Sequence, residues 1–427
     1  MEFKRVVVTG LGAITPLGND VETTWSNAVK GVSGAGPITR FDASLFKTQF
    51  ACEVKDFDPA KYVEEGNRKE LKDFKRNDLF SQYALASAKQ AIDDSGLLDD
   101  ERLDRNEVGV IYGSGIGGIR TLEQEVEAYT LHKESGPKFG PFLIPNMIAD
   151  IAAGRISIKY GFRGPNYAVV SACATSTHAL IDAFNYIRYG KSPVIITGGA
   201  EAPVCPTSVG GFNSMKALST RNDNPMSASR PFSGSRDGFV VGEGAVTLVF
   251  EELEHALARG AKIYGEVIGA GMSADAFHIT ASHPDGLGAI LVMQRALEDA
   301  GIKPDDVDYI NTHGTSTPVG DISEAKAIKE VFGEQAYKMN ISSTKSMTGH
   351  MLGATGAAEA MLSILACKEG VVPPTINHED GDEDPEMDYK MNFTFNKAQK
   401  RNVDIALSNT FGFGGHNACI IVKKYIG

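Results

Sequence analysis

Short apolar runs alternate with segments of helical periodicity along most of the chain, and this alternation constrains the fold more than any other feature. The first run ends at Gly10, where we expect a turn. Between later runs apolar residues recur at helical spacing, as in Leu180, Ala183 and Ile187. Such alternation predicts an α/β fold with at least one mostly parallel sheet. The predicted strands are Arg5–Thr9, Val108–Tyr112, Tyr167–Val170, Val194–Thr197, Val246–Phe250, Tyr264–Gly269, Asp308–Thr312, Met339–Ser342, Asp404–Leu407 and Ala418–Val422.

Composition and charge narrow the class of protein. The N-terminal apolar run is too short for a signal peptide, and no segment approaches the roughly 18 unbroken apolar residues of a membrane helix. The net charge of −12 argues against nucleic-acid binding. Five scattered cysteines without a CxxC pair indicate reduced thiols and argue against structural zinc or a disulfide framework. We therefore expect a cytoplasmic protein that binds neither membrane nor nucleic acid.

The chain shows no linker and no low-complexity tract. A weak division near residue 260, where a second series of strands and helices begins, suggests halves spanning 1–260 and 261–427. The sequence itself shows no readable repeat between them. The acidic stretch Glu379–Glu386 is expected to be a solvated loop.

Cys173 lies in the stretch "SACATSTH", where a predicted strand gives way to a helical pattern. A helix start offers unpaired N–H groups and a positive dipole end, which favour a thiolate and lower the pKa of a thiol. A buried structural cysteine is an equally valid interpretation of the same turn.

Two further predicted strands end in loops that carry histidine. His313 stands in "NTHGTSTP", and His350 follows Lys345 in "SSTKSMTGH". In open α/β sheets, ligands bind beyond the carboxyl ends of the strands. Each histidine alone could be a residue bonded within its turn, and the lysine could be solvated. Three such strand ends in one chain make a shared site the better interpretation.

The stretch Gly113–Gly118, "GSGIGG", satisfies the GxGxxG pattern of dinucleotide-binding loops. The acidic segment Glu123–Glu127 follows it and would repel a phosphate. The pattern alone is therefore weak evidence for nucleotide binding.

Together these motifs resemble the β-ketoacyl-acyl carrier protein synthases of fatty-acid elongation. "SACATSTH", "NTHGTSTP", "SSTKSMTGH" and "NTFGFGGHNA" match in the family's order, and Gly210–Pro225 and Ser229–Ala245 look most like the synthase II branch. The resemblance spans nearly the whole chain. It implies the thiolase fold, with two similar α/β halves in a five-layer sandwich, and a homodimer.

The resemblance assigns catalytic roles residue by residue. Cys173 matches the nucleophile, His313 and His350 the active-site histidines, and Lys345 the motif lysine, with Glu359 holding it. The remaining matches concern the acyl pocket, the gate and the carrier protein. They are Phe413 and Phe411 for oxyanion hole and gate, Ile116 for the acyl pocket, Thr315 and Thr317 for the phosphopantetheine arm, Asp275, His278 and Thr280 for a mobile loop, and Lys75, Arg76, Lys138 and Lys216 for docking. His416 departs from the family's small hydroxyl residue after "GFGG".

The implied reaction is a decarboxylative Claisen condensation of an acyl-enzyme thioester with malonyl-acyl carrier protein. It needs no metal or redox cofactor, although a structural monovalent cation near Glu359 is compatible with the resemblance. A polyketide-type ketosynthase and a non-catalytic scaffold are the alternatives. The presence of Cys173, both histidines and Lys345 argues against the scaffold.

Overall fold

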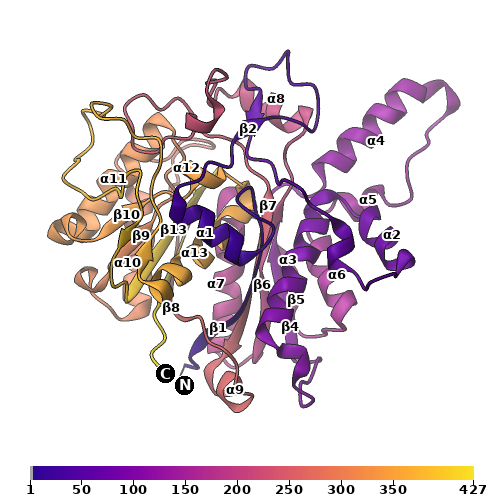
Figure 1. Ribbon diagram of the computed structural model, residues 1–427, viewed down its shortest axis with the longest axis horizontal. Helices are drawn as coiled ribbons and strands as arrows, with labels where there is room; N and C mark the ends of the chain where they lie inside the picture. The colour runs from indigo at the N-terminus through magenta and orange to yellow at the C-terminus, as the bar shows by residue number, and fades with distance from the viewer. Residues whose placement is uncertain (1–2) are drawn as a thin grey trace.

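A computed structural model describes residues 3–427 and shows one continuous ten-stranded sheet with helices on its faces (Figure 1). Met1 and Glu2 lie outside the described residues. All ten predicted strands are found, in the spatial order β10-β9-β13-β14-β8-β1-β7-β6-β4-β5. Their bounds are β1 Val6–Ile14, β4 Val108–Gly113, β5 Asn166–Val169, β6 Val194–Glu201, β7 Gly244–Glu252, β8 Gly265–Ala274, β9 Tyr309–Asn311, β10 Asn340–Ser342, β13 Ile405–Gly412 and β14 His416–Lys423. Two short pairs, β2 Gly36–Pro37 with β3 Phe50–Ala51 and β11 Val371–Val372 with β12 Gln399–Lys400, complete the strands.

The two halves of the sheet repeat one topology. In each, five strands taken in chain order stand in the spatial order 3-2-4-5-1, and β1 pairs with β8 to join the halves. Contacts between β4 and β5, β4 and β6, β9 and β10, and β9 and β13 are parallel, and the others are antiparallel. The prediction of a mostly parallel sheet was wrong, because apolar periodicity marks a strand without fixing its direction.

The helices form three layers around the two half-sheets. Helices α7 and α13 pack against each other in the central layer, with α3 and α6 outside one half-sheet and α10 and α11 outside the other. The α-helices are α1 Val21–Lys30, α2 Arg68–Arg76, α3 Leu79–Ser95, α4 Ile119–His132, α5 Leu143–Met147, α6 Ile151–Tyr160, α7 Thr175–Arg188, α8 Pro206–Ser214, α9 Leu253–Ala258, α10 Leu287–Ala300, α11 Pro318–Phe332, α12 Lys345–Thr348 and α13 Thr355–Glu369. Short 3₁₀ turns, η4 Ala172–Ala174 and η8 Leu352–Ala354, precede the two central helices.

Strand β1 corrects the turn expected at Gly10. The strand continues through Gly10 and Gly12 to Ile14, and α3 lies directly against it. A Cβ atom at Gly10 would stand 2.1 Å from the carbonyl oxygen of Ala91, and one at Gly12 2.0 Å from that of Ser87. These glycines therefore admit a close helix rather than end the strand.

The acidic stretch Glu379–Glu386 is a largely exposed loop, as predicted, and it is anchored to the body at two points. Arg236, whose side chain is buried, bonds Asp384 at 2.8 Å, and Asp382 accepts from the backbone N–H of Ser235 at 2.7 Å. The buried Arg236 and the exposed backbone of Ser235 thus hold two carboxylates of a loop that otherwise faces solvent.

Helix α4 projects from the body of the molecule at the upper right of Figure 1, and none of its residues is buried. Across residues 3–427, no helix combines the length and apolar character needed to cross a bilayer.

Candidate active site

The turn that carries Cys173 joins the edge strand β5 to the central helix α7. Ala172 adopts a left-handed conformation with φ of 50°, which is costly for a residue with a side chain. The hydroxyl of Thr175 accepts from the N–H of Ser171 at 2.8 Å and fixes the turn. Gly412 of β13 lies so close that a Cβ atom there would be 3.1 Å from the backbone nitrogen of Cys173. This crowding holds the strained turn in place.

The state of the Cys173 thiol differs from the sequence-based expectation. Burial raises its pKa to about 11, against the opposing effects of the Phe413 backbone N–H and of Lys345. The pKa depression expected from a helix start was therefore wrong for the substrate-free protein, because loss of hydration outweighs it. The Cys173 thiol carries its proton at neutral pH.

His313 follows β9 on a loop held by a buried carboxylate. The backbone N–H groups of His313 and Gly314 donate to Glu324 of α11 at 2.9 and 2.7 Å. Burial, with smaller contributions from Lys345 and His350, holds the pKa of His313 well below its ordinary value. The imidazole is consequently neutral at neutral pH and has one N–H to donate.

His350 faces His313 across the site, with ring centroids 5.4 Å apart. Its Nδ1 lies 3.0 Å from the hydroxyl of Thr355, the first residue of α13, and its backbone N–H donates to Val240 at 2.7 Å. Burial and then Lys345 hold the pKa of His350 well below the ordinary value. Both histidines are therefore neutral and fixed by their backbones, and His350 is buried while His313 is half-buried.

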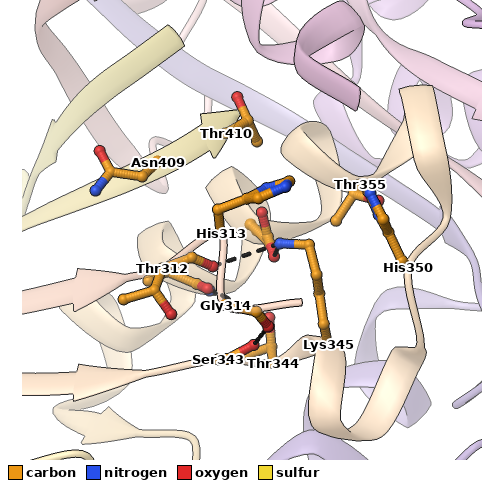
Figure 2. Close-up of polar contacts among 12 residues, drawn as sticks. Thr312, His313, Gly314, Ser343, Thr344, Lys345, His350, Thr355, Asn409 and Thr410 are labelled. Atoms are coloured by element: carbon orange, nitrogen blue, oxygen red, sulfur yellow. Dashed lines mark hydrogen bonds and ion pairs between the residues drawn. The ribbon is translucent and has the colours of Figure 1, made fainter. Parts of the chain in front are cut away.

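Lys345 stands behind the histidines rather than in the cavity. Figure 2 shows its side chain between the loop that carries Thr312 and the segment that carries His350. Its ammonium pairs with Glu359 of α13 and lies 3.4 Å from the carbonyl oxygen of Thr312. Burial raises the pKa of Glu359 to about 8, and Lys345 opposes that rise. The positive charge of Lys345 thus acts on the histidines at close range while remaining screened from solvent.

One cavity of about 430 Å³ brings most of the predicted residues together. Lys216, predicted for docking, also lines it. His278 is exposed and accepts at Nδ1 from the N–H of Thr280 at 3.2 Å, outside the cavity lining. The predicted residues in the lining are Cys173, His313, His350, Ile116, Asp275, Thr280, Thr315, Thr317, Phe411 and Phe413.

The loop between β13 and β14 carries Phe413 and touches the segment that follows β8. The N–H of Gly414 donates to the carbonyl oxygen of Ile279 at 2.8 Å, and the N–H of Asp275 donates to that of Gly415 at 2.9 Å. His416 is exposed, and its ring would lie 2.8 Å from a Cβ atom at Gly414. The gate loop and the predicted mobile loop are therefore hydrogen-bonded to each other.

Sequence reasoning missed three buried carboxylates in the lining: Glu201, Asp321 and Glu324. Burial raises the pKa of Asp321 to about 6 and that of Glu324 to about 7, against the hydrogen bonds that they accept. Asp321 and Glu324 share a helical face with the apolar Ile328, and this spacing was a readable signal. Glu201 closes a strand and had no comparable signal.

The glycine-rich stretch after β4 serves a carboxylate in place of a nucleotide phosphate. Its N–H groups at Gly115 and Ile116 donate to Glu201 at 2.8 and 3.1 Å. Among residues 3–427, His, Cys, Asp and Glu side chains form no group of three or more that could hold a metal ion.

The chain belongs to the β-ketoacyl synthase family. The model of the β-ketoacyl synthase N-terminal domain matches residues 3–256, and that of the C-terminal domain matches residues 264–379. The family resemblance of the motifs is thereby confirmed.

Similar proteins extend over the full chain. The 3-oxoacyl-[acyl-carrier-protein] synthase 2 of Synechocystis sp. is 50% identical over 100% of this chain and 99% of its own, and that of Coxiella burnetii is 49% identical over 99% of each. A β-ketoacyl synthase structure from Burkholderia phymatum has a TM-score of 0.89 at 33% identity, covering 99% of this chain and 100% of its own. A type II PKS ketosynthase in complex with its acyl-carrier protein has a TM-score of 0.88 at 33% identity, covering 99% of this chain and 100% of the matched chain. These neighbours confirm the thiolase-like fold.

Proposed function

We propose that this protein elongates fatty acids by condensing an acyl group on Cys173 with malonyl-acyl carrier protein, giving 3-oxoacyl-acyl carrier protein. The observation that carries the proposal is the meeting of Cys173 with two neutral histidines around one cavity. The names of the relatives that are about 50% identical support the same activity.

Acyl transfer comes first. The sulfur of Cys173 attacks the carbonyl carbon of the acyl thioester, the bond to the pantetheine sulfur breaks, and the proton of Cys173 passes to the leaving thiol. The backbone N–H groups of Cys173 and Phe413 stabilise the oxyanion, and loss of one such donor costs about 10²–10³ in rate. The proximity of the Phe413 N–H to the thiol supports this role.

Decarboxylation follows at the histidines. Malonyl thioester loses CO₂, and the electron pair left behind is delocalised onto the thioester oxygen as an enolate. N–H groups of the neutral His313 and His350 donate to that oxygen, and the enolate carbon then attacks the acyl carbon on Cys173 to expel its sulfur. Lys345, paired with Glu359 outside the cavity lining, sets the local potential and adds to the effect of burial, which keeps both imidazoles neutral.

The carrier protein docks on basic side chains, one of which lies at the cavity. An acidic partner needs a local positive surface on a chain of net charge −12. Arg68, Lys72, Lys75 and Arg76 of α2 line one surface groove. Lys216 at the cavity and the exposed Lys138 extend the proposed docking set.

A second copy of this chain covers the exposed side of β5. This strand has a neighbour on one side only in the sheet, and Val170 after it is 59% exposed. Apolar side chains of the α4–α5 region, such as Leu131 and Ile144, are exposed as well. Val170→Asp should convert a dimer into monomers in light scattering. If the wild-type protein is monomeric at micromolar concentration, the proposed dimer is wrong.

The two halves, 1–260 and 261–427, are proposed as repeated units because their strands share one order and one pattern of directions. A cytoplasmic location agrees with five buried cysteines that form no disulfide. Recovery of the native protein from an oxidising compartment would contradict the cytoplasmic assignment.

We infer a structural monovalent cation near Glu359 from unpaired buried oxygens on α13 and on β13, two elements that contact each other. Within the described residues, Glu359 Oε2, Ser408 Oγ and Asn409 Oδ1 are buried without a hydrogen-bond partner. Oxygen ligands of this kind suit hard cations. When bound, the ion would compensate the charge of the carboxylate that holds Lys345.

Intact mass spectrometry tests the proposed function. Octanoyl- to hexadecanoyl-carrier protein should acylate Cys173, and added malonyl-carrier protein should release a product longer by two carbons. Cys173→Ala is the control and should take no acyl group. Loading by polyketide intermediates alone would favour the polyketide-type ketosynthase, and no loading at all would favour a scaffold.

A further inference from the structure

Glu201, the last residue of β6, has a carboxylate that is fully occupied by hydrogen-bond donors. Oε1 accepts from the hydroxyl of Ser114 at 2.8 Å and from the N–H of Ile116 at 3.1 Å. Oε2 accepts from the N–H of Gly115 at 2.8 Å and from that of Gly353 at 2.9 Å. Three of the four donors are backbone N–H groups, which cannot accept a hydrogen bond from a protonated carboxyl group. Burial raises the pKa of Glu201, and the four hydrogen bonds that its carboxylate accepts oppose that rise and favour the ionised form in this nest of N–H groups.

Glycines at positions 115 and 353 allow the backbone to approach the Glu201 carboxylate closely. A Cβ atom at Gly115 would lie 2.7 Å from Oε2, and one at Gly353 would lie 2.6 Å from Oε2 and 2.5 Å from the nitrogen of Gly115. The carboxylate thus joins the loop after β4 to the η8 turn, which belong to the two different halves of the sheet.

Both joined segments form walls of the cavity that contains Cys173. Ile116 lies within the glycine loop, and Leu352 within the η8 turn, two residues after His350. Leu352 is held in a left-handed conformation with φ of 46°, which needs support from its surroundings. Glu201 itself also lines the cavity. Burial of the thiol is the main cause of the raised pKa of Cys173, and the negative charge of Glu201 adds to it.

We propose that Glu201 is a positioning residue that fixes the acyl pocket by bracing Ile116 against Leu352, and that it thereby sets the preference among acyl chain lengths. The inference rests on the proposed function, because it assumes that acyl groups load onto Cys173. In hydrophobic pockets one methylene changes discrimination by roughly 10-fold or more. A small movement of these walls is therefore enough to alter the preference.

Glu201→Gln tests the positioning role of the carboxylate and changes the volume of the side chain little. The amide NH₂ must face at least one N–H or O–H donor, which repels the glycine loop or the η8 turn. The measurement is a competition between two acyl-carrier substrates, the pair of chain lengths that wild type distinguishes most strongly. We expect the ratio of the two acyl-Cys173 masses to move toward one by about tenfold.

Glu53→Gln is the matched control. Glu53 is also a buried carboxylate that accepts backbone N–H groups, from Thr39 at 2.9 Å and from Arg40 at 3.3 Å, but it lies outside the cavity lining. The Glu53→Gln variant should leave the ratio of the two acyl-Cys173 masses unchanged. A second measurement is the pH midpoint of Cys173 alkylation, which should fall in Glu201→Gln and not in Glu53→Gln, since only the former removes a charge near the thiol.

The outcomes separate this inference from the proposed function. Failure of wild type to load any acyl group contradicts the proposed function. Normal wild-type loading with an unchanged ratio in folded Glu201→Gln overturns the positioning role alone. If Glu201→Gln does not fold, Ser114→Ala, which removes one of the four donors, should shift the ratio in the same direction by a smaller factor. An unchanged ratio in that variant also overturns the role.

Discussion

Titration of Cys173 by pH is the most direct test of the electrostatics of the site. With a pKa of about 11, the thiol is ionised at pH 7 to about one part in 10⁴, against about 3% for an ordinary thiol of pKa ~8.5. The greater nucleophilicity of a more basic thiolate recovers about tenfold. Alkylation at pH 7 should therefore be roughly 30-fold slower than that of an exposed cysteine, before any steric effect of burial.

The assay is alkylation by iodoacetamide between pH 6 and pH 10, with peptide mapping to locate the label. All five cysteines are buried, so mapping must separate Cys173 from the rest. The rate at Cys173 should rise about tenfold per pH unit across the whole range, because the thiol stays below its pKa. A rate that levels off below pH 8 would show that the helix start, and not burial, governs the thiol, and would refute the reasoning.

The same shift has a consequence for stability. The folded-state pKa lies above the unfolded value, so the contribution of the neutral thiol is complete below about pH 9 and is lost as the pH rises toward 11. A shift of two pKa units corresponds to about 3 kcal/mol. Cys173→Ala should therefore lose less unfolding free energy than wild type over this interval in denaturant titrations.

Other predictions address separate parts of the proposal. His313→Ala and His350→Ala should still be acylated at the nucleophile but lose CO₂ release from malonyl-carrier protein by about 10²–10⁴; normal decarboxylation without acylation would mean that the histidines activate the thiol. Lys75→Glu combined with Arg76→Glu should raise KM for carrier-bound substrate and leave kcat with a short pantetheine substrate nearly unchanged, and equal loss with both substrates would contradict docking at α2. Ile116→Phe should shorten the longest acyl chain accepted, and an unchanged chain-length profile would place residue 116 outside the pocket. Replacement of K⁺ and Na⁺ by a bulky organic cation should lower the Tm if the proposed cation binds, and a constant Tm would argue against it.

The sequence predicted where the strands lie but not how they are directed. Each of the ten predicted runs became a strand of the sheet, and strands such as β4, β6 and β7 are buried nearly throughout, which requires continuous apolar residues. Direction and order depend on which strands meet in space. At Gly10, likewise, a glycine that seemed to mark a turn serves the approach of α3.

For the site, the sequence by itself predicted the residues to which chemical roles are assigned, because the proposed nucleophile, the histidines and the lysine stand in contiguous motifs at strand ends. Only the tertiary structure decided their states. The pKa of Cys173 is set first by burial, and the neutral state of both histidines by burial together with Lys345. Glu201 and Glu324 belong to the site only because β6 and α11 are folded against the loops they support. Desolvation and hydrogen bonds between distant segments depend on three-dimensional packing, and no local pattern of residues encodes them.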